Sequence, residues 1–274
     1  MKIANTVWEW GLQSKQDFEQ AVKEISDLGY DAVENFNPLV RFYEDSPEEF
    51  DELMRKYNME FVNLYHYLQN DFEDDFAMAE RCCKFLQKHG AKLLNMQAPW
   101  RPGGDDPKQP WLNTHAPTKD DLDDAIRKLT RIGKLAKKYG ITMCLHPHWG
   151  TMVEREDETA YVLERIDSDI MKLTLDTAHT TIGGMDPVTY FAEHVDRVGY
   201  VHLKDVILDA PDPRNPMTGF RELGRGVVDF RGVVKVLKEG GFDGVLCVEL
   251  DNPRVCNYKG AMISRRYIRE ELGM

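Results

Sequence analysis

The stretch ITMCLHPHWGTMVEREDETAYVLERIDSDIMKLTLDTAH, residues 141–179, sets a helical segment between two short apolar runs. The runs Thr142–Leu145 and Lys172–Leu175 have the length of buried strands, and Asp157–Asp167 between them has the period of an amphipathic helix. Two parallel strands need a crossover of this kind, because a tight hairpin joins only antiparallel strands. The stretch therefore predicts a βαβ unit.

The same alternation extends along all 274 residues. The strands that we expect are Ile3–Val7, Ala32–Asn35, Glu60–Tyr65, Lys92–Met96, Thr142–Leu145, Lys172–Leu175, Gly199–Leu203 and Val245–Glu249. The helices that we expect are Lys15–Leu28, Pro47–Tyr57, Phe72–His89, Lys119–Tyr139, Asp157–Asp167, Pro187–His194, Phe230–Glu239 and Gly260–Leu272. Eight such units without a glycine-rich dinucleotide fingerprint predict an α/β fold, a closed barrel of eight βα units that forms one domain over residues 1–274.

Two long connections interrupt this regular spacing. Ala98–Thr118 and Asp205–Asp229 are rich in proline and glycine, and each follows a predicted strand. Loops that follow the strands of such a barrel meet at its carboxyl-terminal face and build the active site. We therefore expect both insertions beside the functional site.

The composition narrows the class of partner. The chain has 35 basic and 47 acidic residues, a net charge of −12, which disfavours binding to nucleic acid or to an anionic membrane. The sequence has no apolar run of about 18 residues, the length that a membrane-spanning helix requires. Its five cysteines form no Cys-x-x-Cys pair, which is typical of reduced thiols in a cytoplasmic protein. A small-molecule substrate or a bound cation fits this balance better.

Ligand-type side chains collect at the ends of the last four predicted strands. His146, Asp176, His202 and Glu249 follow or close these strands in turn, so in a barrel they face one pocket. Each histidine alone is more often a structural residue, but four such residues on consecutive strands indicate a metal site. Two imidazoles and two carboxylates suit one divalent ion such as Mn²⁺, Co²⁺, Zn²⁺ or Fe²⁺.

Three further residues near these positions are candidates for proton transfer. His148 and His179 each lie two or three residues past a ligand candidate, so they either shuttle protons or pack as supporting histidines. Lys204 either donates to an oxyanion or pairs with Asp205. Glu154 is either a carboxylate in the first turn of a helix, which the sequence favours, or a base.

A second group of residues is predicted to bind substrate. Glu34 at a strand end contacts a substrate hydroxyl, supports a histidine ligand or is simply exposed. Tryptophans at this face suit the C–H faces of a sugar ring, although loop packing explains them equally. Arg225 binds an anion or pairs with surface acids. The predicted substrate-binding set is Trp8, Glu34, His66, Gln97, Trp149 and Arg225, with Trp100 and Trp111 as further aromatic residues of the same face.

Three segments resemble the xylose isomerase-like TIM-barrel superfamily of sugar phosphate isomerases and epimerases. They are LTLDTAH (173–179), VGYVHLKDV (198–206) and VLCVELD (245–251), and the resemblance covers nearly the whole chain. It implies a (β/α)8 TIM barrel with His146, Asp176, His202 and Glu249 as metal ligands. Members of this superfamily are commonly homo-oligomers.

The segment LHPHWGT (145–151) is similar to the inosose dehydratase branch of this superfamily. Ketose epimerases carry a metal-binding glutamate where this chain has His146, and its loss puts two-base epimerisation in doubt. The resemblance implies a lyase that removes an α-proton from a keto-sugar or keto-cyclitol, with an enediolate stabilised by the metal. His148, His179, Lys204 and Glu249 are the candidates for its acid and base.

Three alternatives stay open at this point. The chain is also similar to sugar isomerases or epimerases, which share the first proton abstraction. Enzymes that cleave 3-oxo-glycosides share it too. A sugar-binding barrel without activity would keep the ligands and lose the turnover.

Overall fold

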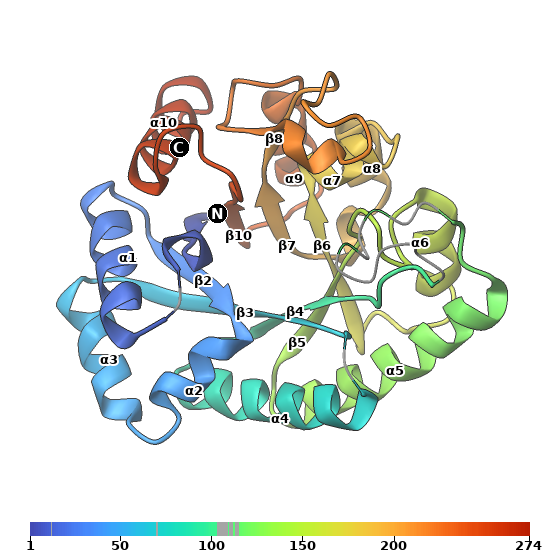
Figure 1. Ribbon diagram of the computed structural model, residues 1–274, viewed down its shortest axis with the longest axis horizontal. Coiled ribbons are helices and arrows are strands. Elements are labelled where there is room, and N and C mark those ends of the chain that lie inside the picture. The colour runs from blue at the N-terminus through green and yellow to red at the C-terminus, as the bar shows by residue number, and fades with distance from the viewer. Residues whose placement is uncertain (12, 70, 103–108, 110–111, 113–114) are drawn as a thin grey trace.

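Eight parallel strands of the computed structural model close into one barrel, with helices arranged around it (Figure 1). The structure describes residues 1–11, 13–69, 71–102, 109, 112 and 115–274. The barrel strands are β1 (Lys2–Thr6), β2 (Ala32–Phe36), β3 (Glu60–Tyr67), β4 (Leu93–Gln97), β5 (Thr142–His146), β6 (Met171–Asp176), β7 (Val198–Leu203) and β10 (Val245–Val248). Strand β1 pairs with both β2 and β10, which closes the barrel. The predicted fold is confirmed, and each predicted strand lies within two residues of the observed bounds.

The predicted helices also form. They are α1 (Lys15–Asp27), α3 (Pro47–Lys56), α4 (Phe72–Lys88), α5 (Lys119–Lys138), α6 (Glu156–Leu163), α8 (Pro187–Glu193), α9 (Phe230–Glu239) and α10 (Asn257–Glu271). Helix α6 ends at Leu163, four residues earlier than predicted. Besides single turns of 3₁₀ helix, the described residues contain short elements that were not predicted: α2 (Val40–Tyr43), α7 (Thr177–Ile182) and the antiparallel pair β8 (Asp205–Val206) and β9 (Phe220–Arg221).

Local sequence explains where the longest helix begins. The side chain of Thr118 accepts a hydrogen bond from the backbone N–H of Asp121, and the Asp121 carboxylate accepts one from the backbone N–H of Thr118. This reciprocal capping satisfies two backbone donors that a helix start otherwise leaves unpaired. The cap ends the insertion that follows β4 and fixes its return to the barrel wall.

The interior of the barrel has an apolar end and a polar end. Small and apolar side chains fill the amino-terminal half, among them Ala4, Ala32, Cys144 and Cys247. Polar side chains occupy the carboxyl-terminal half of the barrel, where the strands end and the loops begin. The larger apolar core lies between the strands and the surrounding helices. A rigid wall therefore carries the polar groups described below.

The five cysteines are free thiols, and four of them are buried. Burial raises the pKa of the Cys83 and Cys144 thiols to about 12 each. Across the described residues, the helices are too short or too polar to cross a lipid bilayer.

Candidate metal centre and active-site cavity

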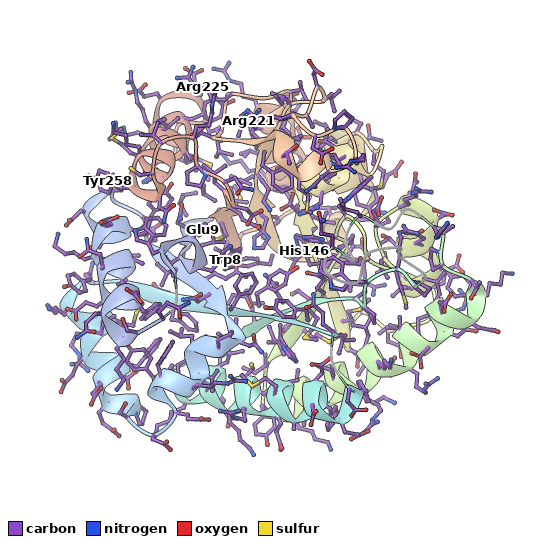
Figure 2. All side chains as sticks on the ribbon, viewed as in Figure 1. Trp8, Glu9, His146, Arg221, Arg225 and Tyr258 are labelled. Carbon is purple, nitrogen blue, oxygen red and sulfur yellow. The ribbon has the colours of Figure 1, made fainter. Side chains whose placement is uncertain are left out.

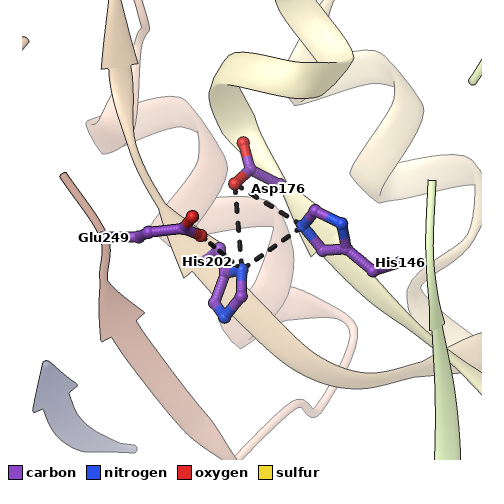
Figure 3. Close-up of side chains that lie close together, drawn as sticks. All are labelled: His146, Asp176, His202 and Glu249. Atoms are coloured by element: carbon purple, nitrogen blue, oxygen red, sulfur yellow. Dashed lines mark hydrogen bonds and ion pairs between the residues drawn. The ribbon is translucent and has the colours of Figure 1, made fainter. Parts of the chain in front are cut away.

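Four side chains converge at the carboxyl-terminal end of the barrel: His146, Asp176, His202 and Glu249 (Figure 3). Nδ1 of His202 lies 2.7 Å from Oε2 of Glu249, 3.3 Å from Nε2 of His146 and 3.8 Å from Oδ2 of Asp176. One ligand atom from each residue lies within 4.8 Å of the other three. The residues predicted as a metal shell are thus brought together, and we call them the metal centre.

Asp176 is held by the start of helix α7. Its Oδ1 accepts hydrogen bonds from the backbone N–H groups of Ala178 and His179, at 2.7 and 2.8 Å. An aspartate in this position caps the helix and becomes rigid. Because Oδ1 is engaged by the cap, Oδ2 is left to face the metal centre.

Neighbouring side chains fix the neutral tautomers of His146 and His202. The Tyr65 hydroxyl donates to Oε1 of Gln97, so its oxygen accepts from Nδ1–H of His146 at 3.2 Å. Nε2–H of His202 donates to Oε2 of Glu34 at 2.8 Å. When neutral, each ring therefore turns an unprotonated nitrogen toward the metal centre, which is the state that binds metal. Burial alone lowers the pKa of the His202 imidazole, but Glu34 and Glu249 on either side of it outweigh burial and raise the pKa, so a cation would have to displace its second proton.

Two observations show that these residues fit a divalent cation. Oδ2 of Asp176 and Oε2 of Glu249 are buried and accept no hydrogen bond from the described residues. The carboxylates of Glu34, Asp176, Glu249 and Asp251 also outnumber the ammonium of Lys204 within this small volume. Buried carboxylates are costly without a counter-charge, and a cation would supply it.

Lys204 is buried beside the metal centre. Its Nζ donates to Oε1 of Glu249 at 2.5 Å and to Oδ2 of Asp251 at 2.9 Å, and lies 4.4 Å from the centre of the Phe220 ring. Burial alone lowers the pKa of the Lys204 ammonium, but the nearby Asp251 and Glu249 outweigh it and raise the pKa above its usual value. Asp205 instead accepts from the backbone N–H groups of Gly226 and Val228, so the predicted Lys204–Asp205 pair does not form.

His148 and His179 lie against each other, with ring centres 3.8 Å apart. Nδ1–H of His148 donates to the carbonyl of Trp149 at 2.8 Å, which leaves Nε2 of His148 as an acceptor. The backbone N–H of Trp149 donates to Nδ1 of His179 at 3.2 Å, so in the neutral ring Nε2 of His179 carries the proton. The two rings therefore hold opposite tautomers, one a proton acceptor and the other a donor.

Burial keeps both rings neutral. Burial, with the charges of His146 and Lys204 adding to it, lowers the pKa of His148 to about 3. Burial likewise lowers the pKa of His179 well below its usual value, and His148 and Lys204 lower it further. Neither imidazole is charged at neutral pH before a substrate arrives.

A cavity of about 500 Å³ opens above the metal centre. Its wall is aromatic and amide-rich, with two carboxylates, and includes the predicted residues Trp8, Gln97, His148 and Glu249. The other lining residues are Phe36, Tyr65, Tyr67, Gln69, Trp100, Asn215, Met217, Thr218, Phe220, Asp251 and Asn252. Such a wall suits an uncharged ligand with hydroxyl groups and C–H faces.

Four residues predicted to bind substrate lie elsewhere. Glu34 is fully buried beneath His202, and His66 is buried on the outer side of β3, where its Nε2 contacts the carbonyl of Asp75 at 2.9 Å. Trp149 contacts His148 through its backbone carbonyl and His179 through its backbone N–H. Arg225 lines a separate groove beside α10, near the edge of the molecule, whereas Trp8 and His146 lie near its middle (Figure 2). Trp111 is outside the described residues.

Tyr65 and Asp251 were not predicted. Tyr65 contacts Nδ1 of His146 and lines the cavity. Asp251 accepts from Nζ of Lys204 and from Nε1–H of Trp8, the latter at 3.4 Å. No signal in the sequence separated Tyr65 from its neighbour His66, and Asp251 lies past the end of β10, where strand alternation no longer applies. Glu154 lies before α6, not in its first turn, and contacts Arg101.

The fold and the place of these residues define an α/β barrel with its polar site at the carboxyl ends of the strands, where TIM-barrel enzymes carry their active sites. Residues 22–273 match the Xylose isomerase-like TIM barrel family, and the chain belongs to this family.

Curated relatives are similar over much of the chain. Inosose dehydratase of Mesomycoplasma hyopneumoniae is 30% identical over 198 residues, which cover 69% of this chain and 62% of that protein. Inosose dehydratase of Geobacillus kaustophilus is 26% identical over 282 aligned residues, covering 94% of this chain and 88% of that protein. A xylose isomerase-like TIM barrel protein from Mycobacterium smegmatis, in complex with magnesium, superposes with a TM-score of 0.77 at 19% identity, covering 97% of this chain and 95% of that one.

Proposed function

We propose that this protein is a divalent-metal-dependent dehydratase that acts on a keto-cyclitol or keto-sugar, as an inosose dehydratase does. The observation that carries the proposal is the pair of opposite tautomers at His148 and His179, held beside the four-residue metal centre. Similarity to two inosose dehydratases supports the substrate class. The cavity wall supports it too, because aromatic faces and amides suit a polyhydroxylated ring.

The metal centre borders the cavity through Glu249. His146, Asp176, His202 and Glu249 would hold a divalent ion, with Mn²⁺, Co²⁺ and Zn²⁺ as the ions that suit the donor set. When bound, the ion would supply Lewis-acid stabilisation of the negative charge that develops on a ketone oxygen.

His148, which lines the cavity, and the buried His179 and Lys204 then divide the proton transfers. Nε2 of His148 takes the proton from the carbon next to the ketone. The electron pair of that C–H bond moves toward the ketone oxygen and gives an enolate. The enolate then re-forms the ketone, its C=C electron pair becomes the double bond between the α- and β-carbons, and the C–O bond to the β-hydroxyl breaks. The leaving hydroxide takes a proton from Nε2–H of His179 or from the Lys204 ammonium and departs as water.

Elimination fits this site better than two-base epimerisation. Glu249 is engaged through Oε1 by Lys204, and its Oε2 faces the other ligands. His146 stands where an epimerase would carry a second carboxylate. The geometry therefore supplies one unprotonated imidazole nitrogen, whereas the two carboxylates that line the cavity, Glu249 and Asp251, are both paired with Lys204.

The test is turnover in D₂O by manganese-loaded protein, with the product separated from the protein and examined by proton NMR. Scyllo-inosose is offered first, beside a panel of ketoses and 3-oxo-glucosides. Loss of water supports the proposal. Deuterium at an α-carbon without elimination would reassign the protein to the isomerases or epimerases, and no exchange with any of these compounds would reject the enolisation chemistry.

His148→Asn gives a matched control for the base. The amide N–H₂ of asparagine takes the place of Nδ1–H and keeps the hydrogen bond to the Trp149 carbonyl, while the basic Nε2 is lost. We expect turnover to fall by about 10²–10⁴-fold, the usual contribution of a general base, with metal binding unchanged. Unchanged turnover would remove His148 from the mechanism.

A further inference from the structure

The peptide group between Trp149 and Gly150 connects His148 to a buried carboxylate. Its carbonyl accepts from Nδ1–H of His148, and its N–H donates to Oε2 of Glu154 at 2.9 Å. The C=O and N–H of a trans peptide lie in one plane and point in opposite directions, so His148 and Glu154 contact opposite edges of one rigid group. The orientation of this plane decides whether a carbonyl oxygen or an N–H faces the imidazole.

Glycine at position 150 leaves the orientation of this plane open. Gly150 has a φ of +78°, in the left-handed region that side chains disfavour. Because glycine occupies both signs of φ readily, the backbone preference of Gly150 does not by itself fix the orientation of the Trp149–Gly150 peptide. The acceptor at Glu154 is therefore the feature that selects one orientation.

Arg101 holds Glu154 in place. Its Nε lies 3.3 Å from Oε2 of Glu154, its Nη2 donates to both oxygens of Glu158 at 2.7 and 2.8 Å, and its backbone N–H donates to the Gly150 carbonyl at 2.9 Å. The Arg101 side chain is fully buried, and those of Glu154 and Glu158 are 3% and 5% exposed. Burial raises the pKa of Glu154, while the Gly150 N–H and Arg101 favour its ionised form.

The loop after β4 and the loop after β5 are joined at this point. Trp100 and Thr151 form an antiparallel bridge, and the backbone N–H of Met152 donates to the Pro99 carbonyl at 2.9 Å. Nη1 of Arg101 also donates to the His115 carbonyl at 3.0 Å. These contacts hold Arg101 between the two loops, and Arg101 in turn holds the Glu154 carboxylate against Gly150 N–H.

We propose that Glu154, with Arg101 as its counter-ion, is a positioning residue that holds the Trp149–Gly150 peptide so that its carbonyl orients His148 with Nε2 free toward the cavity. The proposal rests on His148 being the proton acceptor of the proposed function. A carboxylate next to a catalytic histidine usually contacts the imidazole directly. Here Glu154 acts on His148 through the Trp149–Gly150 peptide group, which contacts both side chains.

The experiment uses zinc-loaded, full-length protein labelled with ¹⁵N at histidine. The Nδ1–H signal of His148 is assigned by its loss in His148→Asn. In Glu154→Met the acceptor for Gly150 N–H is removed, and we expect this signal to disappear. We expect kcat to fall about 10²-fold, the effect of a displaced catalytic group, while KM changes by less than about threefold. In Glu154→Gln the amide oxygen still accepts from Gly150, and the signal and most of kcat return.

Glu158→Met is the matched control, because Glu158 is buried, shares Arg101 and accepts from the backbone N–H of Glu154, whereas Gly150 N–H donates to the Glu154 side chain. We expect it to lower the melting temperature and to keep the His148 signal and kcat within about threefold of the original. Equal losses in Glu154→Met and Glu158→Met would overturn the proposal, since a general loss of stability would explain both.

A milder variant covers a failure of Glu154→Met to fold. Glu154→Asp keeps the charge beside Arg101 and withdraws the acceptor from Gly150 by one methylene, so the His148 signal should again be lost. A retained signal in a folded Glu154→Asp or Glu154→Met protein would reject the positioning role. Absence of turnover by the unaltered protein would reject the proposed function alone, because the NMR signal still decides the role of Glu154.

Discussion

Two buried groups of charged side chains stand close together at the carboxyl-terminal face, and they differ in how completely they are paired. At the metal centre, Oδ2 of Asp176 and Oε2 of Glu249 accept no hydrogen bond from the described residues. Around Arg101, by contrast, the guanidinium binds Glu154, Glu158 and the His115 carbonyl. The first group has more carboxylates than the single ammonium of Lys204 neutralises, whereas in the second group Arg101 contacts both carboxylates.

This difference separates a binding function from a structural one. A protein gains nothing in stability from an unpaired buried carboxylate, so its presence indicates a site built for a ligand. A paired buried network holds its loops in one arrangement, and its loss is costly because a charge is left unpaired. The two groups should therefore respond in opposite ways to the loss of one charge.

The largest effect is expected for Asp176→Asn at the metal centre. Asparagine caps a helix as well as aspartate does, so α7 should form and the protein should fold. Metal binding should be lost, and turnover should fall at least about 10²-fold, since Lewis-acid stabilisation contributes several kcal/mol. Isothermal titration with Mn²⁺ and turnover measured in parallel check both expectations.

Metal removal provides the control for that variant. At a metal concentration 100 times the Kd, binding stabilises the folded protein by about 2.7 kcal/mol, or roughly 5–10 °C in melting temperature. Chelation should remove this increment from the original protein and leave Asp176→Asn unchanged. A metal-dependent shift of the same size in Asp176→Asn would contradict the assignment of Asp176 as a ligand.

Arg101→Met tests the paired group. It leaves Glu154 and Glu158 without their shared counter-charge, and loss of one partner from a buried pair typically costs about 3–5 kcal/mol. We expect the melting temperature to fall by about 10 °C, with metal affinity little changed. Arg127→Met serves as a control, because Arg127 pairs with Asp124 at the surface, where such pairs contribute about 0–1 kcal/mol. Equal losses in the two variants would show that the Arg101 group is not specially stabilising.

The sequence predicted the barrel and the metal centre for the same reason. Strand and helix periods are local, and in a parallel barrel every strand end faces one site. Closure of the barrel was the one long-range contact needed to predict that four side chains meet: His146, Asp176, His202 and Glu249. The Arg101 group could not be predicted in this way, since Arg101 meets Glu154 and Glu158 across 53 and 57 residues of chain, through two loops without regular period.

The sequence also could not show which of two neighbouring residues of β3 points into the barrel. His66 was selected as a ligand-type residue, but alternation along the strand turns Tyr65 into the barrel and His66 toward α4. The predicted strand ended at Tyr65, whereas the observed strand continues to Tyr67. The last residue of the predicted strand therefore did not show which of its side chains face the barrel interior. Arg225 illustrates a different difficulty, because it lies in a long insertion whose path no periodic pattern describes.

Glu34→Gln has the smallest expected effect and decides between two roles that the sequence left open for Glu34. The carboxylate accepts from Nε2–H of His202 and from the Asn95 amide, at 2.8 and 2.7 Å. One of these donors would face the amide N–H₂ of the new glutamine, which disturbs the orientation of His202. Loss of such a supporting carboxylate typically weakens metal affinity by about 10–100-fold. Competition with a chromophoric chelator measures this change, and His66→Gln, outside the barrel, should leave the affinity unaltered. An unchanged metal affinity together with a raised KM would instead make Glu34 a substrate contact, and the metal centre would then depend on its four ligands without support from below.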